Sequence, residues 1–245
     1  MANSVAKRNY EEEFRRRVGF IKDIVSRSTA EGIVYGNSGG KDSALVGILC
    51  KAACENTLSV IMPCVGESKE QNARDAQIIA EQFDIETRTV DITETKKSAI
   101  AALGEAVTLN DIADAHIAPR LRMTTLYAIA AAEKRLVAGT GNKSENFIGF
   151  FTKWGDGAYD FNPIADLTAT EVYEFLEYLG APQFIIDKAP TATVYDGETV
   201  EEGLKYRELD TYLLHGEVSE AVLEKIGKLH AKSQHKREPS RTFKK

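Results

Sequence analysis

The chain has 245 residues, and its formal net charge of -6 argues against a nucleic-acid binder, because such proteins neutralise phosphates with basic side chains. Hydrophobic residues make up 43% and charged residues 28% of the sequence, a composition typical of a globular protein with a buried core. We therefore expect one domain over residues 1–245, with no nucleic-acid partner.

The sequence contains no targeting or membrane signal. No apolar run approaches the ~20 residues of a membrane span, and the charged N-terminus lacks the apolar segment of a signal peptide. We therefore expect a soluble, cytoplasmic protein with no membrane partner. The cysteines Cys50, Cys54 and Cys64 contain no CxxC motif, and reduced, mostly buried thiols are the favoured interpretation. The spacing of Cys50 and Cys54, one helical turn, would also suit a metal or redox pair.

Hydrophobic periodicity predicts alternating strands and helices up to residue 140. This alternation indicates a parallel sheet covered by helices on both faces, in which ligands bind beyond the carboxyl ends of the strands. The predicted helices cover residues 9–28, 44–54, 69–83, 94–103 and 118–134, and the predicted strands cover residues 32–36, 57–63, 86–92 and 135–140.

The pattern changes after residue 150. An irregular loop precedes Thr168, which we expect to cap a helix over 169–179. Prolines and glycines predict a loop-rich segment over 181–200. The last predicted elements are helices over 201–214 and 218–232 and a basic tail over 233–245, which we expect to be mobile unless it is bound.

A glycine-rich turn follows the first predicted strand and precedes a helix. Glycine permits positive φ and a close approach of the backbone to a ligand, and free N–H groups at a helix N-terminus bind anions. The turn therefore predicts a phosphate-binding loop. Its residues are Gly36, Asn37, Ser38, Gly39, Gly40, Lys41, Asp42 and Ser43.

This loop is not a Walker A motif. Asp42 follows Lys41 where that motif has Ser or Thr, and Tyr35 stands at the place of its first glycine. The Asp42 carboxylate would repel phosphate unless a cation lies between them, and Mg²⁺ resolves that conflict. A tight strand–helix turn, with Asp42 in the first turn of the helix, is the structural alternative.

Six segments resemble known enzymes in order along the chain. SGGKDS at 38–43 resembles the SGGxDS signature of the PP-loop ATP-pyrophosphatases, which cleave ATP between the α and β phosphates. The other five resemble the ammonia-dependent NAD synthetases, over nearly the whole chain. The resemblance implies a homodimer and a Rossmann-like α/β fold, a parallel sheet flanked by helices of the adenine nucleotide α-hydrolase type. The five segments are PRLRMTTLY at 119–127, GTGNKSE at 139–145, FFTKWGDGAYDFNPIADLTATEV at 150–172, KAPTA at 188–192 and HKREP at 235–239.

The resemblance also implies residue roles. ATP would be held by the glycine loop with Thr140 and Thr191. Asp42 and Glu145 would ligate Mg²⁺, and Asp156 would handle ammonia or its protons, so Asp42 and Asp156 are the candidate catalytic residues. Deamido-NAD would be held by Arg120, Tyr127, Lys153, Asp160, His235 and Lys236, the last two reaching from the neighbouring subunit.

Each of these residues alone also has a structural interpretation. Glu145 suits an exposed acid near a helix start, and Tyr127 suits a core position. Arg120 suits a solvated helix face, although its guanidinium also suits bidentate binding of an anion. His235 and Lys236 suit the charge of a basic tail.

The sequence departs from the family pattern at three places, of which Asn37 in place of a common apolar residue matters little. Ala169 stands where family members carry a lysine that contacts the ATP phosphates, and our hypothesis is that Lys41 supplies the missing charge. HIAPR at 116–120 differs from the family's N-x-KAR, which puts contacts from this loop in doubt.

The reaction implied by the resemblance is that of a ligase. The nicotinate carboxylate of deamido-NAD attacks ATP, and ammonia displaces AMP from the adenylate to give NAD, the last step of NAD biosynthesis. The ~30 residues before the glycine loop are too few for a fused glutaminase domain, so we expect free ammonia or a separate glutaminase to supply the nitrogen. The alternatives are a non-catalytic nucleotide sensor, which Ala169 favours, and another PP-loop adenylating enzyme.

Overall fold

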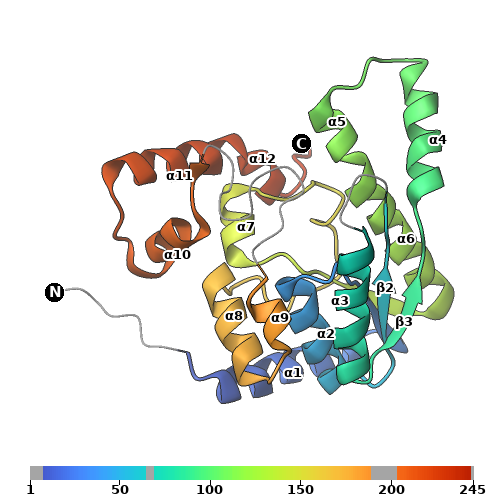
Figure 1. Ribbon diagram of the computed structural model, residues 1–245, viewed down its shortest axis with the longest axis vertical. Helices are drawn as coiled ribbons and strands as arrows, with labels where there is room; N and C mark the ends of the chain where they lie inside the picture. Colours follow the sequence, from blue (N-terminus) through green and yellow to red (C-terminus); the bar gives the residue numbers. More distant parts are fainter. Residues whose placement is uncertain (1–7, 65–68, 189–202, 244–245) are drawn as a thin grey trace.

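The chain folds around a parallel β-sheet in the computed structural model, which describes residues 8–64, 69–188 and 203–243. In these ranges the strands are β1 Gly32–Gly36, β2 Thr57–Ile61, β3 Glu86–Thr89 and β4 Arg135–Ala138, in the order β3-β2-β1-β4 (Figure 1). Val34 of β1 lies opposite Leu58 and Val137. The strand order reverses at β1, so the carboxyl ends of β1 and β4 form a topological switch point, where sheets of this type bind ligands.

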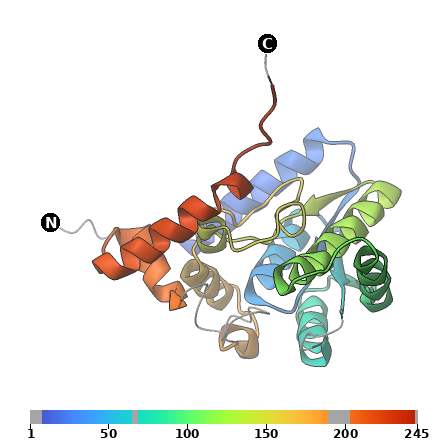
Figure 2. The same cartoon turned by 90° about the horizontal axis from the view of Figure 1, so that it is seen from above.

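Helices cover both faces of this sheet. On one face lie α1 Tyr10–Arg27, α2 Lys41–Ala53, α3 Lys69–Gln82 and α8 Ala169–Tyr178, and on the other α4 Thr93–Gly104, α5 Asp111–Ala115 and α6 Ile117–Glu133. α2 packs against β1 and β2 with α1, α3 and α8 around it, and α6 packs against β1 and β4 (Figures 1 and 2). Among the described helices, none combines the length and apolar character needed to cross a bilayer.

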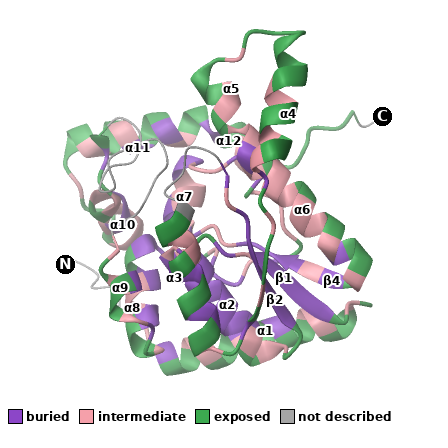
Figure 3. Ribbon diagram, turned by 45° about the vertical axis from the view of Figure 1, so that its right-hand side comes forward, coloured by how far each residue is buried: buried purple, intermediate pink, exposed green. Residues whose placement is uncertain are grey.

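The alternation of side chains along β1 divides the core into two layers. Ile33 and Tyr35 are buried with residues of α1, α2 and α8, whereas Val34 is buried with Ala130 of α6. Successive strand residues face opposite sides of a sheet, so a strand covered on both faces requires a continuous apolar run. Figure 3 shows β1 and β2 buried in the middle of the molecule, and α4 contributes no buried residue.

The C-terminal part forms a second, smaller apolar cluster beside the sheet. Its helices are α7 Lys143–Ile148, α10 Tyr206–His215 and α11 Glu220–Lys232, with the short helix α12 Gln234–Arg237 after α11. The short helix α9 Gln183–Ile186 packs against α8 instead. Ile148 and Leu209 are buried in this cluster. Lys236 of α12 donates from Nζ to the carbonyls of Gly149 and Phe151, both at 2.8 Å. This piece of the basic tail therefore docks on the loop after α7, and mobility of the whole tail stays a prediction.

The α/β fold predicted from the sequence is confirmed, and the main differences are short helices. The sequence does not predict α5, α7, α9 and α12, because helices of four to six residues are too short to show a period. Thr168 caps α8 as predicted. α10 begins at Tyr206 rather than at residue 201, since the Glu208 carboxylate accepts the Lys205 N–H at 3.0 Å and fixes the helix start there.

Substitution of Phe175 tests the core layer between α2 and α8. Phe175 is fully buried, and its ring centroid lies 5.0 Å from that of Tyr10. Phe175→Ala should lower the free energy of unfolding by about 3–5 kcal/mol, because it leaves a cavity as well as losing apolar burial. Urea unfolding followed by circular dichroism measures this change.

The control is Phe20→Ala in α1, where Phe20 is 47% exposed. It should change the free energy of unfolding by less than about 1 kcal/mol. Equal effects of the two substitutions would contradict the position of the core.

Candidate active site

Two loops converge at the switch point between β1 and β4. Residues 37–40 connect β1 to α2 and carry the glycine-rich turn, and residues 139–142 connect β4 to α7. They leave the carboxyl ends of adjacent parallel strands, so they meet at one edge of the sheet. Thr140 lies in the second loop, whereas Thr191 lies outside the described residues, and the assignment of both to ATP stays a prediction.

Buried contacts hold the glycine loop from behind. Gly39 has a φ of +71°, and a Cβ there would lie 2.2 Å from the Asn72 carbonyl oxygen, so only glycine fits. Asn37 is 3% exposed, and its Nδ2 donates to Ser59 Oγ and to the Ala76 carbonyl, both at 3.1 Å. Its Oδ1 accepts the Gly39 N–H at 3.1 Å. The Asn37 side chain therefore anchors the loop, and a contact of this residue with ATP stays a prediction.

The front of the glycine loop presents hydroxyl and N–H groups. Ser38 Oγ and Ser43 Oγ lie 3.2 Å apart, and Ser38 Oγ accepts the Gly40 N–H at 3.3 Å. Gly40 is the N-cap residue of α2 and provides no side-chain cap for that helix. An N-terminus without a side-chain cap, next to two hydroxyls, suits an anion such as phosphate.

Asn142 contacts both candidate metal ligands, Asp42 through its side chain and the Glu145 carboxylate through its backbone N–H. Asn142 is fully buried, and its Nδ2 donates to Asp42 Oδ1 at 3.0 Å. Its Oδ1 accepts the Glu145 N–H at 3.0 Å, and its own N–H donates to Glu145 Oε2 at 3.1 Å, which makes a capping box at the start of α7. The GTGNKSE segment is therefore a helix start that fixes Glu145 relative to Asp42.

Lys41 lies between these acids and α8. Its Nζ is 2.5 Å from Asp42 Oδ2 and 5.4 Å from the ring centroid of Tyr173. Tyr173 lies one helical turn after Ala169, the position at which family members carry a lysine. Lys41 is therefore on the same side of the site as that missing lysine. Burial acts to lower the pKa of Lys41, but the charges of Asp42 and Glu145 outweigh it, and the pKa is raised.

Burial and a neighbouring carboxylate both raise the pKa of Glu145. Desolvation, followed by the charge of Asp42, raises the pKa of Glu145 to about 8, although Lys41 acts to lower it. Within the described residues, no group of three His, Cys, Asp or Glu side chains could hold a metal ion by itself. Mg²⁺ binds commonly through one or two carboxylates together with substrate phosphates. The donor set therefore fits a magnesium ion that shares its ligands with a nucleotide.

Asp160 links α6 to the end of β4. Its Oδ2 accepts the Val137 N–H at 2.7 Å, and its Oδ1 accepts the Tyr127 hydroxyl at 3.2 Å. Desolvation and the charge of Asp160 raise the pKa of Tyr127 to about 12, so the hydroxyl keeps its proton and donates. Tyr127 and Asp160, both predicted to bind deamido-NAD, are thus brought into contact, while their contact with that substrate stays a prediction.

Lys153, Trp154 and α12 form the outer part of the site. Lys153 Nζ donates to the His235 carbonyl at 2.6 Å and lies 5.5 Å from the Trp154 ring centroid. Trp154 is 56% exposed and has a φ of +63°, a conformation that bulky residues rarely adopt. Arg120 Nη2 lies 3.4 Å from the Lys153 carbonyl. Arg120, Lys153 and His235 therefore meet within one chain, and the reach of His235 into a neighbouring subunit stays a prediction.

Asp156 shares a hydrogen-bonded loop with a histidine that the sequence does not identify as a site residue. Asp156 Oδ1 accepts the Thr152 N–H at 2.9 Å, and Thr152 Oγ1 lies 2.8 Å from His116 Nδ1. Desolvation by the surrounding loop raises the pKa of Asp156. Desolvation, followed by the charges of Lys236 and Arg120, lowers the pKa of His116, which favours its neutral form at pH 7. The one sequence signal that could have pointed to His116 is the HIAPR segment, because it departs from the family pattern.

A buried carboxylate from the C-terminal cluster also supports the site. Asp210 is 2% exposed and accepts hydrogen bonds from Ser144 Oγ and from the N–H and hydroxyl of Thr170, the last two at 2.7 Å. Ser144 Oγ also accepts the Ala169 N–H at 3.1 Å. Asp210 thereby ties α10 to the first turns of α7 and α8, next to Glu145. Its partners are distant in sequence, so no local motif predicts this role.

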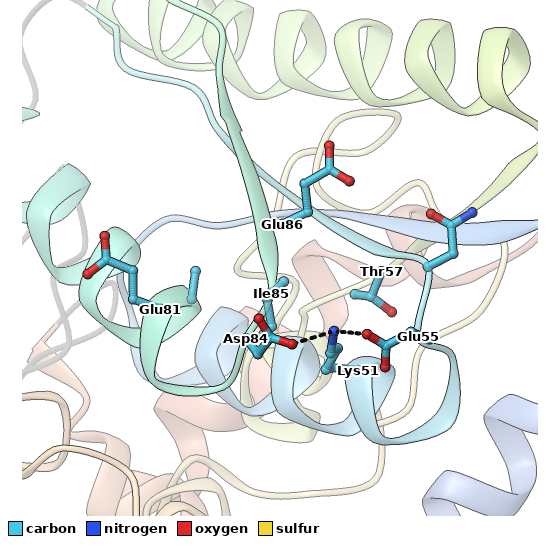
Figure 4. A pocket seen from close by; sticks show the side chains of 9 residues that line it. Lys51, Glu55, Thr57, Glu81, Asp84, Ile85 and Glu86 are labelled. Carbon is cyan, nitrogen blue, oxygen red and sulfur yellow. Dashed lines mark hydrogen bonds and ion pairs between the residues drawn. The ribbon is translucent and has the colours of Figure 1, made fainter.

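A surface cavity of about 500 Å³ lies at the opposite end of the strands (Figure 4). Thr57 and Glu86, the first residues of β2 and β3, lie on its wall. Lys51 in this cavity is 2.5 Å from Glu55 and 3.4 Å from Asp84, so acidic neighbours balance its charge. The cavity is at the amino ends of the strands and is not part of the candidate site.

A glycine loop before an uncapped helix, with paired acids at the switch point of a parallel sheet, is typical of nucleotide-binding α/β enzymes. Comparison of the chain with known proteins supports this class. A sequence profile described as NAD synthase matches residues 13–240. The NH(3)-dependent NAD(+) synthetase of Carboxydothermus hydrogenoformans is 43% identical over 234 residues, which cover 94% of this chain and 96% of that protein.

Two solved structures are similar over almost the whole chain. The NMN synthetase of Francisella tularensis has a TM-score of 0.90 at 35% identity and covers 97% of this chain and 99% of its own. The NH3-dependent NAD synthetase of Campylobacter jejuni, in complex with a nitrate ion, has a TM-score of 0.81 at 29% identity, with 97% and 100% covered. The chain belongs to the NAD synthase family, and it is a ligase that forms a C–N bond. A nucleotide sensor is not favoured.

The raised pKa of Glu145 predicts a pH dependence of stability. The folded chain keeps a proton on Glu145 up to about pH 8, whereas the unfolded chain loses it near the ordinary pKa of 4.5. This stabilising contribution is therefore complete below pH 4.5 and is lost as the pH rises towards 8. In Mg²⁺-free buffer, Glu145→Gln should melt at a higher temperature than the wild type at pH 8, and the difference should shrink towards pH 5.

The control for this pH series is Glu55→Gln, because the Glu55 side chain is 85% exposed. Its melting temperature should follow that of the wild type at every pH. A Glu145→Gln difference that stays constant across the pH range would contradict the raised pKa.

Proposed function

We propose that the chain forms NAD from deamido-NAD, ATP and ammonia at the switch point between β1 and β4. The observation that carries this proposal is the joining of the phosphate-binding loop to a second acid, Glu145, through the buried Asn142. Relatives of nearly equal length are NH(3)-dependent NAD(+) synthetases, including one from Archaeoglobus fulgidus at 41% identity.

The first half-reaction makes the adenylate. The nicotinate carboxylate attacks the α-phosphorus of ATP, and pyrophosphate leaves with the bonding electrons. The hydroxyls of Ser38 and Ser43 and the N–H groups at the start of α2 hold the phosphates in line. This step needs positioning and charge neutralisation rather than covalent chemistry by the protein.

Asp42 and Glu145 are the residues that would hold Mg²⁺, since their oxygens suit this ion and their mutual repulsion favours a cation. Bound Mg²⁺ supplies positive charge to the phosphate oxygens. Lys41, already 2.5 Å from Asp42, adds a second positive charge at the same place. The charge of Lys41 compensates for the lysine that family members carry at the position of Ala169.

The second half-reaction forms the amide. Ammonia displaces AMP from the adenylate, and the nitrogen loses a proton. Asp156 accepts that proton, because desolvation raises its pKa towards the working pH. The charge of Lys236 acts on the same carboxylate and limits the rise.

One observation favours a second substrate. The TM-score of 0.90 with the Francisella tularensis NMN synthetase exceeds the 0.81 with the Campylobacter jejuni NAD synthetase. Amidation of nicotinate mononucleotide is therefore the second candidate. Both substrates carry the same reacting carboxylate, and the glycine loop serves both in the same way.

We also propose that the chain is cytoplasmic and acts as a homodimer, the second of which the resemblance implies. α4 and α5 project from the body of the molecule (Figure 1), and three large apolar residues in this region, Leu103, Val107 and Ile112, are exposed. Val107 is 53% exposed and Ile112 is 70% exposed. Exposed apolar side chains that gather in one region suit a contact between chains.

The proposed reaction is tested by product analysis of purified protein with ATP, Mg²⁺, ammonium and either deamido-NAD or nicotinate mononucleotide. We expect NAD, AMP and pyrophosphate in equal amounts, with the higher kcat/KM for deamido-NAD. Replacing ammonium with glutamine should abolish the product. A higher kcat/KM for the mononucleotide would assign the second candidate. ATP binding without amide formation from either substrate would contradict both.

The role of Lys41 is tested by Lys41→Ala. The KM for ATP should rise by at least about tenfold, because a charge-assisted hydrogen bond contributes about 1.5–3 kcal/mol. The KM for the nicotinate substrate should not change. Initial rates at varied ATP measure both constants, and Lys51→Ala, at the other end of α2 and paired with Glu55, is the control. An unchanged KM for ATP would refute the hypothesis.

A further inference from the structure

Lys188 follows α9 and reaches across to the glycine loop. Its Nζ donates to the Gly39 carbonyl at 3.0 Å, to Asn72 Oδ1 at 2.7 Å and to Asp75 Oδ2 at 2.6 Å. An ammonium group has three protons to donate, so these three acceptors use all of them. Lys188 therefore has no donor left for a phosphate, and it meets the loop from the side of α3.

The carboxylate that binds Lys188 is fixed in place. Asp75 is 3% exposed, and its Oδ1 accepts the Gln71 Nε2–H at 2.6 Å. Asn72 and Asp75 are three residues apart on α3, so they lie on the same face of that helix. An ammonium held by a buried carboxylate with complete hydrogen bonds has one defined position. The position of the Gly39 carbonyl is thereby set by α3.

The orientation of the Gly39–Gly40 peptide follows from that carbonyl. The peptide is planar and trans, so the Gly39 carbonyl and the Gly40 N–H point in opposite directions. With the carbonyl bound to Lys188 behind the loop, the N–H faces forward, where it lies 3.3 Å from Ser38 Oγ. Glycine also tolerates the reverse orientation, which would turn a carbonyl oxygen towards a bound phosphate and repel it.

We propose that Lys188 is a positioning residue of the pyrophosphate site, because it fixes the Gly39–Gly40 peptide with its N–H towards the phosphates. This inference rests on the proposed function, which supplies the pyrophosphate. It adds a residue outside the GNSGGKDS loop to the machinery that holds ATP. It also assigns α3 a part in the site, since Asn72 and Asp75 hold the Lys188 ammonium.

A matched pair of variants isolates the effect of Lys188. Lys188→Met alone would leave Asp75 as a buried carboxylate without its cation, and the chain would lose stability for that reason. The comparison is therefore between Asp75→Asn and the double variant Asp75→Asn with Lys188→Met. Neither has an unpaired buried carboxylate, and only the first retains the Lys188 ammonium next to Gly39. The melting temperature of each variant shows that both are folded.

The readouts are the affinity for inorganic pyrophosphate with Mg²⁺, by titration calorimetry, and the KM values for ATP and deamido-NAD. We expect the double variant to bind pyrophosphate about tenfold more weakly than Asp75→Asn, the equivalent of one well-made hydrogen bond to a charged group. The KM for ATP should rise in parallel, and the KM for deamido-NAD should not change. Equal pyrophosphate affinities in the two variants would overturn the proposal, as would a matching loss of affinity for deamido-NAD.

Failure of the inference and failure of the proposed function give different results. Weaker pyrophosphate binding by the double variant supports the role of Lys188 even when no amide is formed, and then only the proposed function falls. NAD formation by the wild type, with equal pyrophosphate affinities in the two variants, refutes the role of Lys188 alone.

Discussion

The buried side chain of Asn142 joins the two loops of the site, and the other groups take their positions from this contact. Its Nδ2 binds Asp42 after β1, and its Oδ1 binds the Glu145 N–H after β4. Both ends of one amide are used and the side chain is fully buried, so the Asp42 carboxylate is tied to the backbone at the start of α7. The sheet makes this possible, because β1 and β4 are parallel neighbours whose carboxyl ends lie side by side.

The same constraint extends outward through buried polar contacts. Asp210 connects the C-terminal cluster to Ser144, the residue before Glu145. Lys236 of α12 binds the carbonyls of the loop after α7, and Lys153 binds the His235 carbonyl. The residues proposed to bind the nicotinate substrate are thus held to the loop after α7, the helix that carries Glu145. A carboxylate attack on phosphorus requires such a fixed distance between two substrates.

Local signals in the sequence predict much of the fold and of the site. Apolar runs such as GIVYG define strands, and Thr168 defines the start of α8, because both signals come from neighbouring residues. The glycine loop and GTGNKSE are also local. The HIAPR and KAPTA segments contain His116 and Lys188, but the roles of these residues and of Asp210 could not be found in this way, since they depend on partners such as Gly39 and Thr152 that are far along the chain. Long-range hydrogen bonds leave no periodic pattern in a sequence.

Trp154 has a consequence for the study of this enzyme in solution. It is the single tryptophan of the chain, and it lies 56% exposed in the same loop as Lys153 and Asp156. Because indole emission responds to the polarity around the ring, the intrinsic fluorescence of the protein reports on this loop and on no other tryptophan environment. Any change around this indole during a single turnover can therefore be followed in real time without an attached label.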